Sequence, residues 1–113
     1  MRVIKTDSLE TLAEQFLTYL TTIKQLSGHT ITSYRADLHR LIDFCVENDI
    51  SSWQEVQSHQ LRRYVALAHQ AGISGTSQQR RLSTVRTFYN FLIKEGLTRA
   101  NPVLAVSTPR SPK

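Results

Sequence analysis

Apolar residues recur every three or four positions in four separate segments, and this periodicity constrains the fold more than any other feature of the sequence. Such spacing places the apolar side chains on one face of an α-helix, whereas a half-buried strand needs strict alternation. Helices are expected at about residues 7–24, 29–47, 58–70 and 77–95, with a short turn at 102–106. A chain of 113 residues is long enough for one domain with a single core. The sequence therefore predicts an all-α orthogonal bundle of four main helices plus a short C-terminal turn.

The expected helix ends rest on residues that satisfy the unpaired backbone groups of a first or last turn. Asp7-Ser8-Leu9-Glu10 has the pattern of a capping box, and Ser58 is the expected cap of the third helix. Ser74-Gly75-Thr76-Ser77 is expected to form the turn and cap before the fourth helix, which Gly96 ends in the left-handed conformation. Asn101-Pro102 is a cap followed by proline, as at the start of a short helical turn. No internal repeat is evident.

Positive charge is concentrated in the second half of the chain. The formal net charge is +5, but residues 1–58 contain five basic and eight acidic residues, whereas residues 59–113 contain nine basic residues and one acid, Glu95. This asymmetry is typical of a surface that binds a polyanion, and nucleic acid is the first candidate. Cys45 is the only cysteine, which excludes an intrachain disulfide, and no apolar run is long enough to span a membrane. We therefore expect a cytoplasmic protein.

The polar faces of the second and fourth helices are the candidate binding surfaces. Hydroxyl, amide and basic side chains lie opposite the apolar stripe of the fourth helix, which has no Asp or Glu between Ser77 and Lys94. Such a helix fits the major groove of B-DNA, where Arg neutralises phosphates and contacts guanine. The second helix carries Asp37, Asp43 and Glu47, so only its first turns and Arg40 are expected to approach phosphate. A solvated polar face without a ligand is the simpler alternative for both helices.

Catalytic and metal-binding constellations are not evident. The four histidines have neither i,i+4 pairing nor a cysteine partner, which argues against a metal site. Cys45, Tyr34, Tyr64 and Tyr89 lie on apolar stripes and are expected to pack in the core. Trp53 is expected to anchor the loop before the third helix. We therefore predict no catalytic residue, no metal and no cofactor in this chain.

Two segments resemble the Xer-type tyrosine recombinases. Residues 26–38 (LSGHTITSYRADL) resemble the pattern L-S-x-x-T-x-x-x-Y-x-x-D-L that opens the second helix of that family. Residues 79–92 (QRRLSTVRTFYNFL), followed by Glu95-Gly96 and Asn101-Pro102, are similar to its R-x-L-S-x-L-R-x-F-Y-x-F-L…E-G…N-P signature. Residues 52–54 (SWQ) and 106–110 (VSTPR) look most like the XerC branch.

The resemblance implies a SAM-like core-binding domain, the N-terminal domain of phage integrases, which forms half of a clamp around duplex DNA. Residues 1–106 would be this clamp domain, and residues 107–113, rich in proline and serine, a linker to a catalytic domain absent from the chain. In the family the second and fourth helices face the major groove. The matching positions are Thr30, Thr32, Ser33 and Arg40 on the second helix and Thr76, Ser77, Arg80, Arg81, Ser83, Thr84 and Arg86 on the fourth. In helical projection Arg81 and Thr84 lie off the polar face, and a pair between Arg81 and Asp37 is an alternative to phosphate contact.

The resemblance also implies what the full-length enzymes do. They cut and rejoin DNA through a 3′-phosphotyrosyl intermediate, with neither a metal nor a nucleotide cofactor, and their catalytic residues lie in the domain missing here. The implied partners are a short, partly palindromic double-stranded recombination site and a XerD-like recombinase in a tetrameric synapse. The implied roles are DNA integration and recombination, and the resolution of chromosome dimers before cell division. Neither a membrane nor a small-molecule ligand is expected, and the nonpolar residues 102–106 are expected to contact a neighbouring protomer or to fold back on their own core.

Two other functions fit the same helices. A basic helical protein-interaction module would bind an acidic protein instead of DNA, and retention on duplex DNA at low salt distinguishes the two. A helix-turn-helix regulator would need a sharp turn of three or four residues between adjacent helices and a dimer interface. The connection at residues 72–76 approaches such a turn, but the sequence shows no dimer seam.

Overall fold

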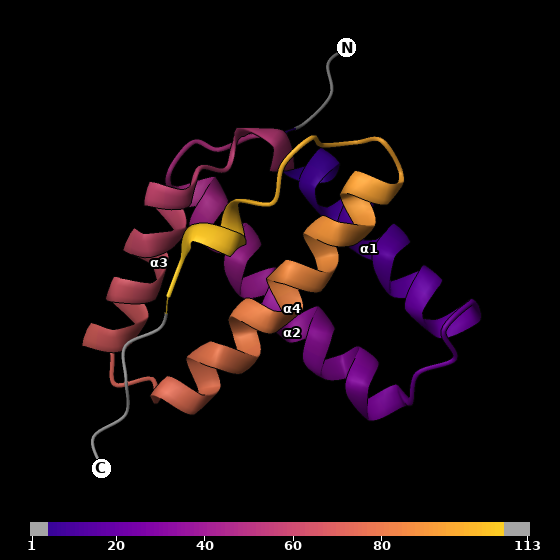
Figure 1. Cartoon of the computed structure of the whole chain (residues 1–113), viewed down its shortest axis with the longest axis horizontal. Helices are drawn as coiled ribbons and strands as arrows, with labels where there is room; N and C mark the ends of the chain where they lie inside the picture. The colour runs from indigo at the N-terminus through magenta and orange to yellow at the C-terminus, as the bar shows by residue number, and fades with distance from the viewer. Residues whose placement is uncertain (1–4, 108–113) are drawn as a thin grey trace. The chain divides into compact units, whose positions relative to one another are not determined.

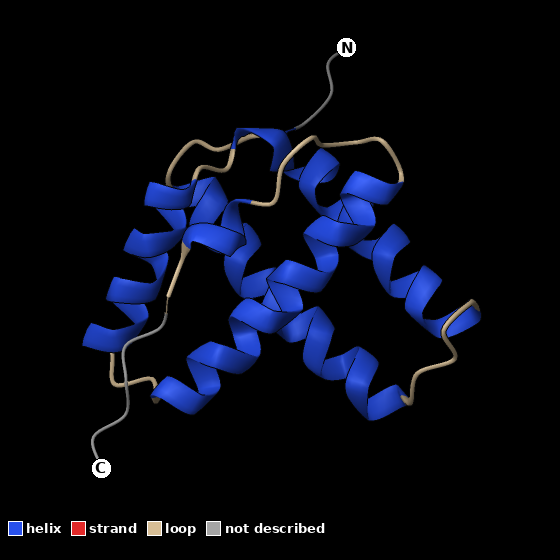
Figure 2. Cartoon of the chain, in the orientation of Figure 1, coloured by secondary structure: helices blue, strands red, loops and turns tan. Residues whose placement is uncertain are grey.

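The computed structural model describes the backbone of residues 5–107 and the side chains of residues 9–107. Its elements are the α-helices α1 (Lys5–Thr22), α2 (Gly28–Glu47), α3 (Ser58–Gln70) and α4 (Gly75–Lys94) and the short 3-10 helices η1 (Trp53–Glu55) and η2 (Pro102–Ala105) (Figure 1). The described part contains helices and loops but no strand (Figure 2). The prediction of an all-α chain with four main helices and a C-terminal turn is confirmed. Over this same part, no helix is both long and apolar enough to cross a membrane.

The chain forms two compact units, which divide between Glu55 and Val56. In the first unit α1 packs against α2, and the Phe16 and Tyr34 rings stack with their centroids 6.1 Å apart. Trp53 is buried, and its indole Nε1 donates a hydrogen bond of 2.9 Å to the Leu9 carbonyl, which confirms that it anchors the loop after α2. Cys45 is also in the interior, where burial raises the pKa of its thiol to about 12.

In the second unit α3 packs against α4, and η2 contacts both helices (Figure 1). Val103 is 1% exposed, whereas Leu104 is 71% exposed. Two side chains of α3 hold this segment: Ser58 Oγ donates to the Pro102 carbonyl at 2.8 Å, and Arg62 Nη1 donates to the Ala105 carbonyl at 3.0 Å. Of the two alternatives for residues 102–106, folding back on the same unit is therefore the one observed for η2.

Several helix starts differ from the predicted ones. α1 begins at Lys5, so Asp7 and Ser8 lie inside its first turn and not at its cap; their side chains are outside the described set. Ser58 does not cap α3, because its hydroxyl donates a hydrogen bond to the Pro102 carbonyl. Gln57 is the residue before the helix, and its backbone amide donates to Gln60 Oε1 at 2.7 Å. Ile23 lies within the range 7–24 expected for the first helix, but it is exposed and follows the last residue of α1.

The ends of α2 and α4 are built alike, although no repeat is evident in the sequence. Each helix has 20 residues and follows a serine, Ser27 or Ser74, whose hydroxyl accepts the amide three residues ahead at 3.2 and 3.1 Å. At the other end Asp49 (φ 59°) and Gly96 (φ 75°) both adopt the left-handed conformation that closes a helix. The two helices with candidate binding faces are thus fixed at both ends by their own local sequence.

Candidate nucleic-acid interface

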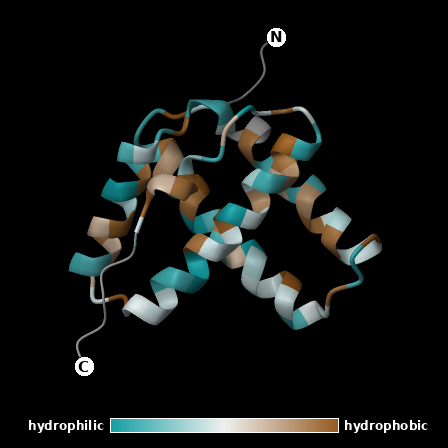
Figure 3. Ribbon diagram, viewed as in Figure 1, coloured by the Kyte–Doolittle hydropathy of each residue, from teal (hydrophilic) through white to brown (hydrophobic). Residues whose placement is uncertain are grey.

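One face of α4 combines exposed basic, amide and hydroxyl side chains. At 100° per residue these positions fall on an arc of about 120°, opposite the buried stripe. We call them the α4 polar face: Thr76, Gln79, Arg80, Ser83, Arg86, Thr87, Asn90 and Lys94. All are exposed except Thr87, which is half-buried, and the hydropathy colouring shows hydrophilic turns in the amino-terminal half of this helix (Figure 3).

The charged residues of this face are all basic. No acidic residue occurs in α4, and Glu95 is the only acid among residues 56–107, against seven basic residues. Residues 9–55 contain three basic and seven acidic residues. The second unit therefore has a net charge of about +6 over these residues and the first about −4, and a polyanion is attracted to the second.

Three hydroxyl groups of α4 already make hydrogen bonds within the helix or its cap. Ser77 is half-buried, its Oγ lies 3.1 Å from Ser74 Oγ, and its amide donates to the same oxygen. Thr84 is 2% exposed and its hydroxyl donates to the Arg80 carbonyl. The expectation that Thr84 contacts DNA is therefore not supported, because its side chain is directed into the packed side of the helix. Thr87 donates to the Ser83 carbonyl at 3.0 Å.

The arginines of α4 differ in their surroundings. Arg80 and Arg86 are exposed, whereas Arg81 is half-buried and its Nε is a buried donor without a hydrogen-bond partner within residues 9–107. An unsatisfied guanidinium nitrogen costs free energy unless a ligand or water meets it. Arg81 thus remains a candidate for anion contact, although it lies outside the α4 polar face.

The candidate residues of α2 form a separate set in the first unit, and three of the four lie in the first two turns of the helix. Thr32 and Ser33 are exposed, and Thr30 is half-buried with its hydroxyl 3.0 Å from Ser27 Oγ, so it belongs to the helix cap. Arg40 lies two turns further on, and its Nη1 donates to Asp37 Oδ1 at 3.2 Å. Because the Asp37 side chain is fully buried and offers a carboxylate, Arg40 already has an anionic partner in its own helix.

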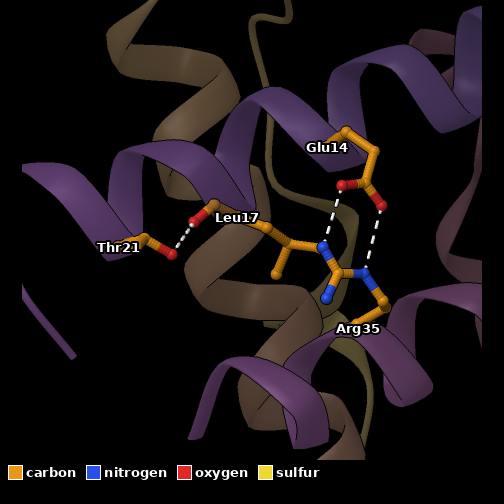
Figure 4. A network of polar contacts seen from close by, with 4 residues as sticks. All are labelled: Glu14, Leu17, Thr21 and Arg35. Atoms are coloured by element: carbon orange, nitrogen blue, oxygen red, sulfur yellow. Dashed lines mark hydrogen bonds and ion pairs between the residues drawn. The ribbon is translucent and has the colours of Figure 1, made fainter. Parts of the chain in front are cut away.

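The outer face of α1 has the opposite character. An open hollow of ≈ 630 Å³ is lined by exposed residues of this helix, namely Glu10, Thr11, Glu14, Gln15 and Thr18. Glu14 receives two hydrogen bonds from Arg35, of 2.9 and 3.3 Å, which link α1 to α2 (Figure 4). These bonds lower the pKa of Glu14 against a weaker opposing effect of burial. The carboxylates at this hollow repel phosphate, so we do not include it in the interface.

Two asparagines of the second unit were absent from the predicted site residues. Asn101, 9% exposed, donates through Nδ2 to the Arg86 carbonyl and to Asn90 Oδ1, at 3.2 and 3.1 Å. Asn90 is one of the amide side chains that lie opposite the apolar stripe of α4, but the family resemblance assigns it no role. Its spacing of four residues from both Arg86 and Lys94 is the sequence signal that marks it. No group of three or more potential metal ligands occurs among the described residues.

Comparison with known proteins relates this chain to phage integrases and tyrosine recombinases. Residues 13–96 match the family model described as phage integrase, N-terminal SAM-like domain. A tyrosine recombinase XerC of Yersinia pestis is 40% identical over 104 residues, which are 92% of this chain and 34% of that protein. A tyrosine recombinase XerC of Pseudomonas entomophila is 38% identical over 102 residues, with 90% and 34% covered. The chain thus spans about a third of the length of these curated relatives.

A solved structure has a similar fold. The crystal structure of the N-terminal domain of a phage integrase/site-specific recombinase from Haloarcula marismortui superposes with a TM-score of 0.80 and covers 90% of this chain and 96% of that one. At 18% identity the similarity concerns the fold alone.

Proposed function

The chain belongs to the family of phage integrase N-terminal SAM-like domains, and from this we propose that it binds duplex DNA as the core-binding domain of a site-specific tyrosine recombinase. Membership confirms the resemblance to the Xer-type enzymes that the motifs of α2 and α4 indicated. The observation that carries the proposal is the α4 polar face, which presents Arg80, Arg86 and Lys94 at the surface of a helix without a single acid. A merely solvated helix face normally mixes both signs of charge.

The geometry favours groove binding by α4. A helix fits the major groove, which is about 12 Å wide, and arginine and hydroxyl side chains meet phosphates and base edges there. We assign the principal contacts to Thr76, Arg80, Ser83 and Arg86, with Ser77 and Arg81 at the margin. From the first unit, Thr32 and Ser33 are the exposed candidates, with Thr30 beside the cap of α2. Arg40 would have to leave Asp37 to reach a phosphate, so we rank it last.

The chemistry of the whole enzyme follows from the relatives named tyrosine recombinase XerC. In a recombinase of their length this domain would supply affinity and position on the DNA, and cleavage and rejoining would take place in another part. On the same basis we propose a cytoplasmic setting, a short and partly palindromic target and a XerD-like partner in a tetrameric synapse. Chromosome dimer resolution before cell division would be the cellular role.

Charge reversal on α4 tests the proposal. Arg80→Glu and Arg86→Glu should each weaken binding of a labelled 30-base-pair duplex by about tenfold or more at low salt, and the double variant should abolish a gel shift. Lys24→Glu is the matched control, because it makes the same change of two charge units at the exposed Lys24 of the first unit. Circular dichroism should remain helical in every variant.

Two results would overturn the proposal. One is the absence of any retention of the wild-type chain on duplex DNA at low salt. The other is equal weakening by Lys24→Glu and by the two α4 variants, since binding would then depend on total charge alone. Capture of an acidic protein by the same face, together with no binding to DNA, would instead support an interaction module.

A further inference from the structure

The side-chain amide of Asn101 has a fixed orientation. The backbone amide of Val103 donates to Asn101 Oδ1 at 3.1 Å, and the backbone carbonyl of Arg86 accepts from Asn101 Nδ2 at 3.2 Å. A backbone N–H can only donate and a backbone carbonyl can only accept. Reversing the Asn101 amide would therefore set two donors against each other and two acceptors against each other, so only one orientation is compatible with the backbone.

Asn101 in turn fixes the amide of Asn90. The second hydrogen of Asn101 Nδ2 is donated to Asn90 Oδ1 at 3.1 Å, and asparagine offers only one side-chain acceptor atom. The oxygen of Asn90 therefore faces Asn101, and its Nδ2 is directed the other way, at an exposed position of α4. Within residues 9–107 this Nδ2 donates no hydrogen bond, so both of its hydrogens are available to a ligand.

Asn90 stands between two cations on the same row. Arg86, Asn90 and Lys94 are spaced four residues apart, so their side chains follow one another along one side of α4, about 6 Å apart along the helix axis. Arginine and lysine side chains are donors only, and Asn90 becomes a donor as well once its oxygen is occupied. The row Arg86–Asn90–Lys94 thus presents hydrogen-bond donors and positive charge to whatever covers it.

We infer that Asn90 is a further DNA-contacting residue that donates to a backbone phosphate, and that Asn101 is the positioning residue that orients it. The inference rests on the proposed function. Asparagine reads adenine with its oxygen and nitrogen together, and here Asn101 holds the oxygen, which leaves a donor suited to phosphate oxygens. α4 is about 30 Å long, so where the helix crosses a groove about 12 Å wide its far half lies over the sugar–phosphate backbone.

An isosteric substitution separates the two roles of Asn90. In Asn90→Asp a carboxylate still accepts from Asn101, so the fold keeps its hydrogen bond, but the outward donor becomes a charged acceptor that repels phosphate. We expect duplex binding at least about tenfold weaker than wild type. Gln70→Glu makes the same amide-to-carboxylate change at an exposed position of α3 and should alter binding by less than about twofold.

Thermal unfolding tests the orientation without DNA. Asn90→Asp should shift the Tm by less than about 2 °C. Asn101→Asp should lower it by about 5 °C or more, because a carboxylate oxygen then faces the Arg86 carbonyl and Asn90 Oδ1. Equal destabilisation by both changes would overturn the assigned orientation.

The binding outcomes are distinct from those that test the proposed function. If wild type binds duplex DNA and Arg80→Glu weakens it, but Asn90→Asp binds like Gln70→Glu, then only the role of Asn90 is wrong. If wild type does not bind duplex DNA, the proposed function fails, and the inference fails with it. Selective loss in Asn90→Asp together with an unchanged Tm supports both roles.

Discussion

Arg35 and Glu14 show how a single contact can define the surface of the first unit. The guanidinium meets the carboxylate through two nitrogens and links α1 to α2, although both side chains are about half exposed, at 45% and 49%. The same pair removes Arg35 from the cations available to a phosphate and raises the pKa of its guanidinium. The first turns of α2 therefore have hydroxyl groups and the positive end of the helix dipole for an anion, but Arg35 is already paired with Glu14.

Loss of the Glu14–Arg35 ion pair should have a modest, pH-dependent effect on the free energy of unfolding. A carboxyl whose pKa is lowered on folding stabilises the protein above its unfolded value, near 4.5, and the contribution is lost as the pH falls through the folded value. Glu14→Gln should reduce the free energy of unfolding by less than about 1 kcal/mol at pH 7, because exposed pairs are screened by solvent. The gap between wild type and variant in urea unfolding should close towards pH 3.

Glu10→Gln is the matched control on the same helix, since Glu10 makes no ion pair within residues 9–107 and should show no such gap. A difference between wild type and Glu14→Gln that stayed constant from pH 7 to pH 3 would contradict the assignment.

At the scale of elements, α2 and α4 depend on their caps. Each begins after a serine whose hydroxyl satisfies an amide of the first turn, and each is followed by a left-handed residue whose successor bonds back to the helix at 2.8 Å. The similar ends come from different residues, because asparagine and aspartate tolerate positive φ while glycine adopts it without steric cost. Asp49 is the second residue after the end of α2, and Gly96 is the second residue after the end of α4.

Substitutions at Gly96 and Asp49 should change the free energy of unfolding in opposite directions. Gly96→Ala should lower the free energy of unfolding by about 1 kcal/mol, since open space surrounds the added methyl and the cost is the positive φ alone. Asp49→Gly should be neutral or stabilising by up to about 1 kcal/mol for the same reason. Urea denaturation measures both changes.

Gly28→Ala provides the control, because Gly28 has equal space at the start of α2 without a positive φ. It should not destabilise the chain. A loss equal to that of Gly96→Ala would show that the cost does not arise from the left-handed conformation.

At the scale of the whole molecule, the two units carry opposite charge. Residues 9–55 of the first unit are net acidic and residues 56–107 of the second are net basic, so a polyanion is attracted mainly to the second unit. Because of this uneven distribution, electrostatic attraction favours an approach of the polyanion to one unit, which a uniform charge of +5 would not do. If the chain binds DNA as proposed, its affinity should be sensitive to salt, because binding would release cations condensed on the DNA.

The salt dependence of binding measures how many phosphates the chain contacts. With about four to six phosphates, the slope of log K against log salt concentration should lie near −4 to −5, with a dissociation constant in the range of about 1 to 100 μM at moderate salt. Fluorescence anisotropy across a salt series gives the slope, and removal of the charge of Arg86 should reduce its magnitude by about one. A slope near zero would exclude an interface dominated by phosphate contacts.

Much of this molecule followed from local patterns in the sequence. The buried Cys45 and Tyr89, the loop anchor Trp53 and the positive φ of Gly96 were predicted from spacing and residue type, whereas Ile93, placed on the apolar stripe of the fourth helix, is 39% exposed. Errors occurred where a distant segment used a group that local rules assign elsewhere. Ser58 is the clearest case: its hydroxyl was expected to cap its own helix and instead bonds to Pro102, 44 residues away.

The sequence by itself determined the helices, their polar faces and the separation of charge, because these depend on residue type and on a period of 3.6 residues. Only the tertiary structure decided which polar groups are still free to act. Thr84 is buried, and Asn90 is oriented by Asn101, which lies in the loop between α4 and η2. These outcomes depend on contacts between residues that are distant in the chain or on opposite sides of a helix, which no local pattern specifies.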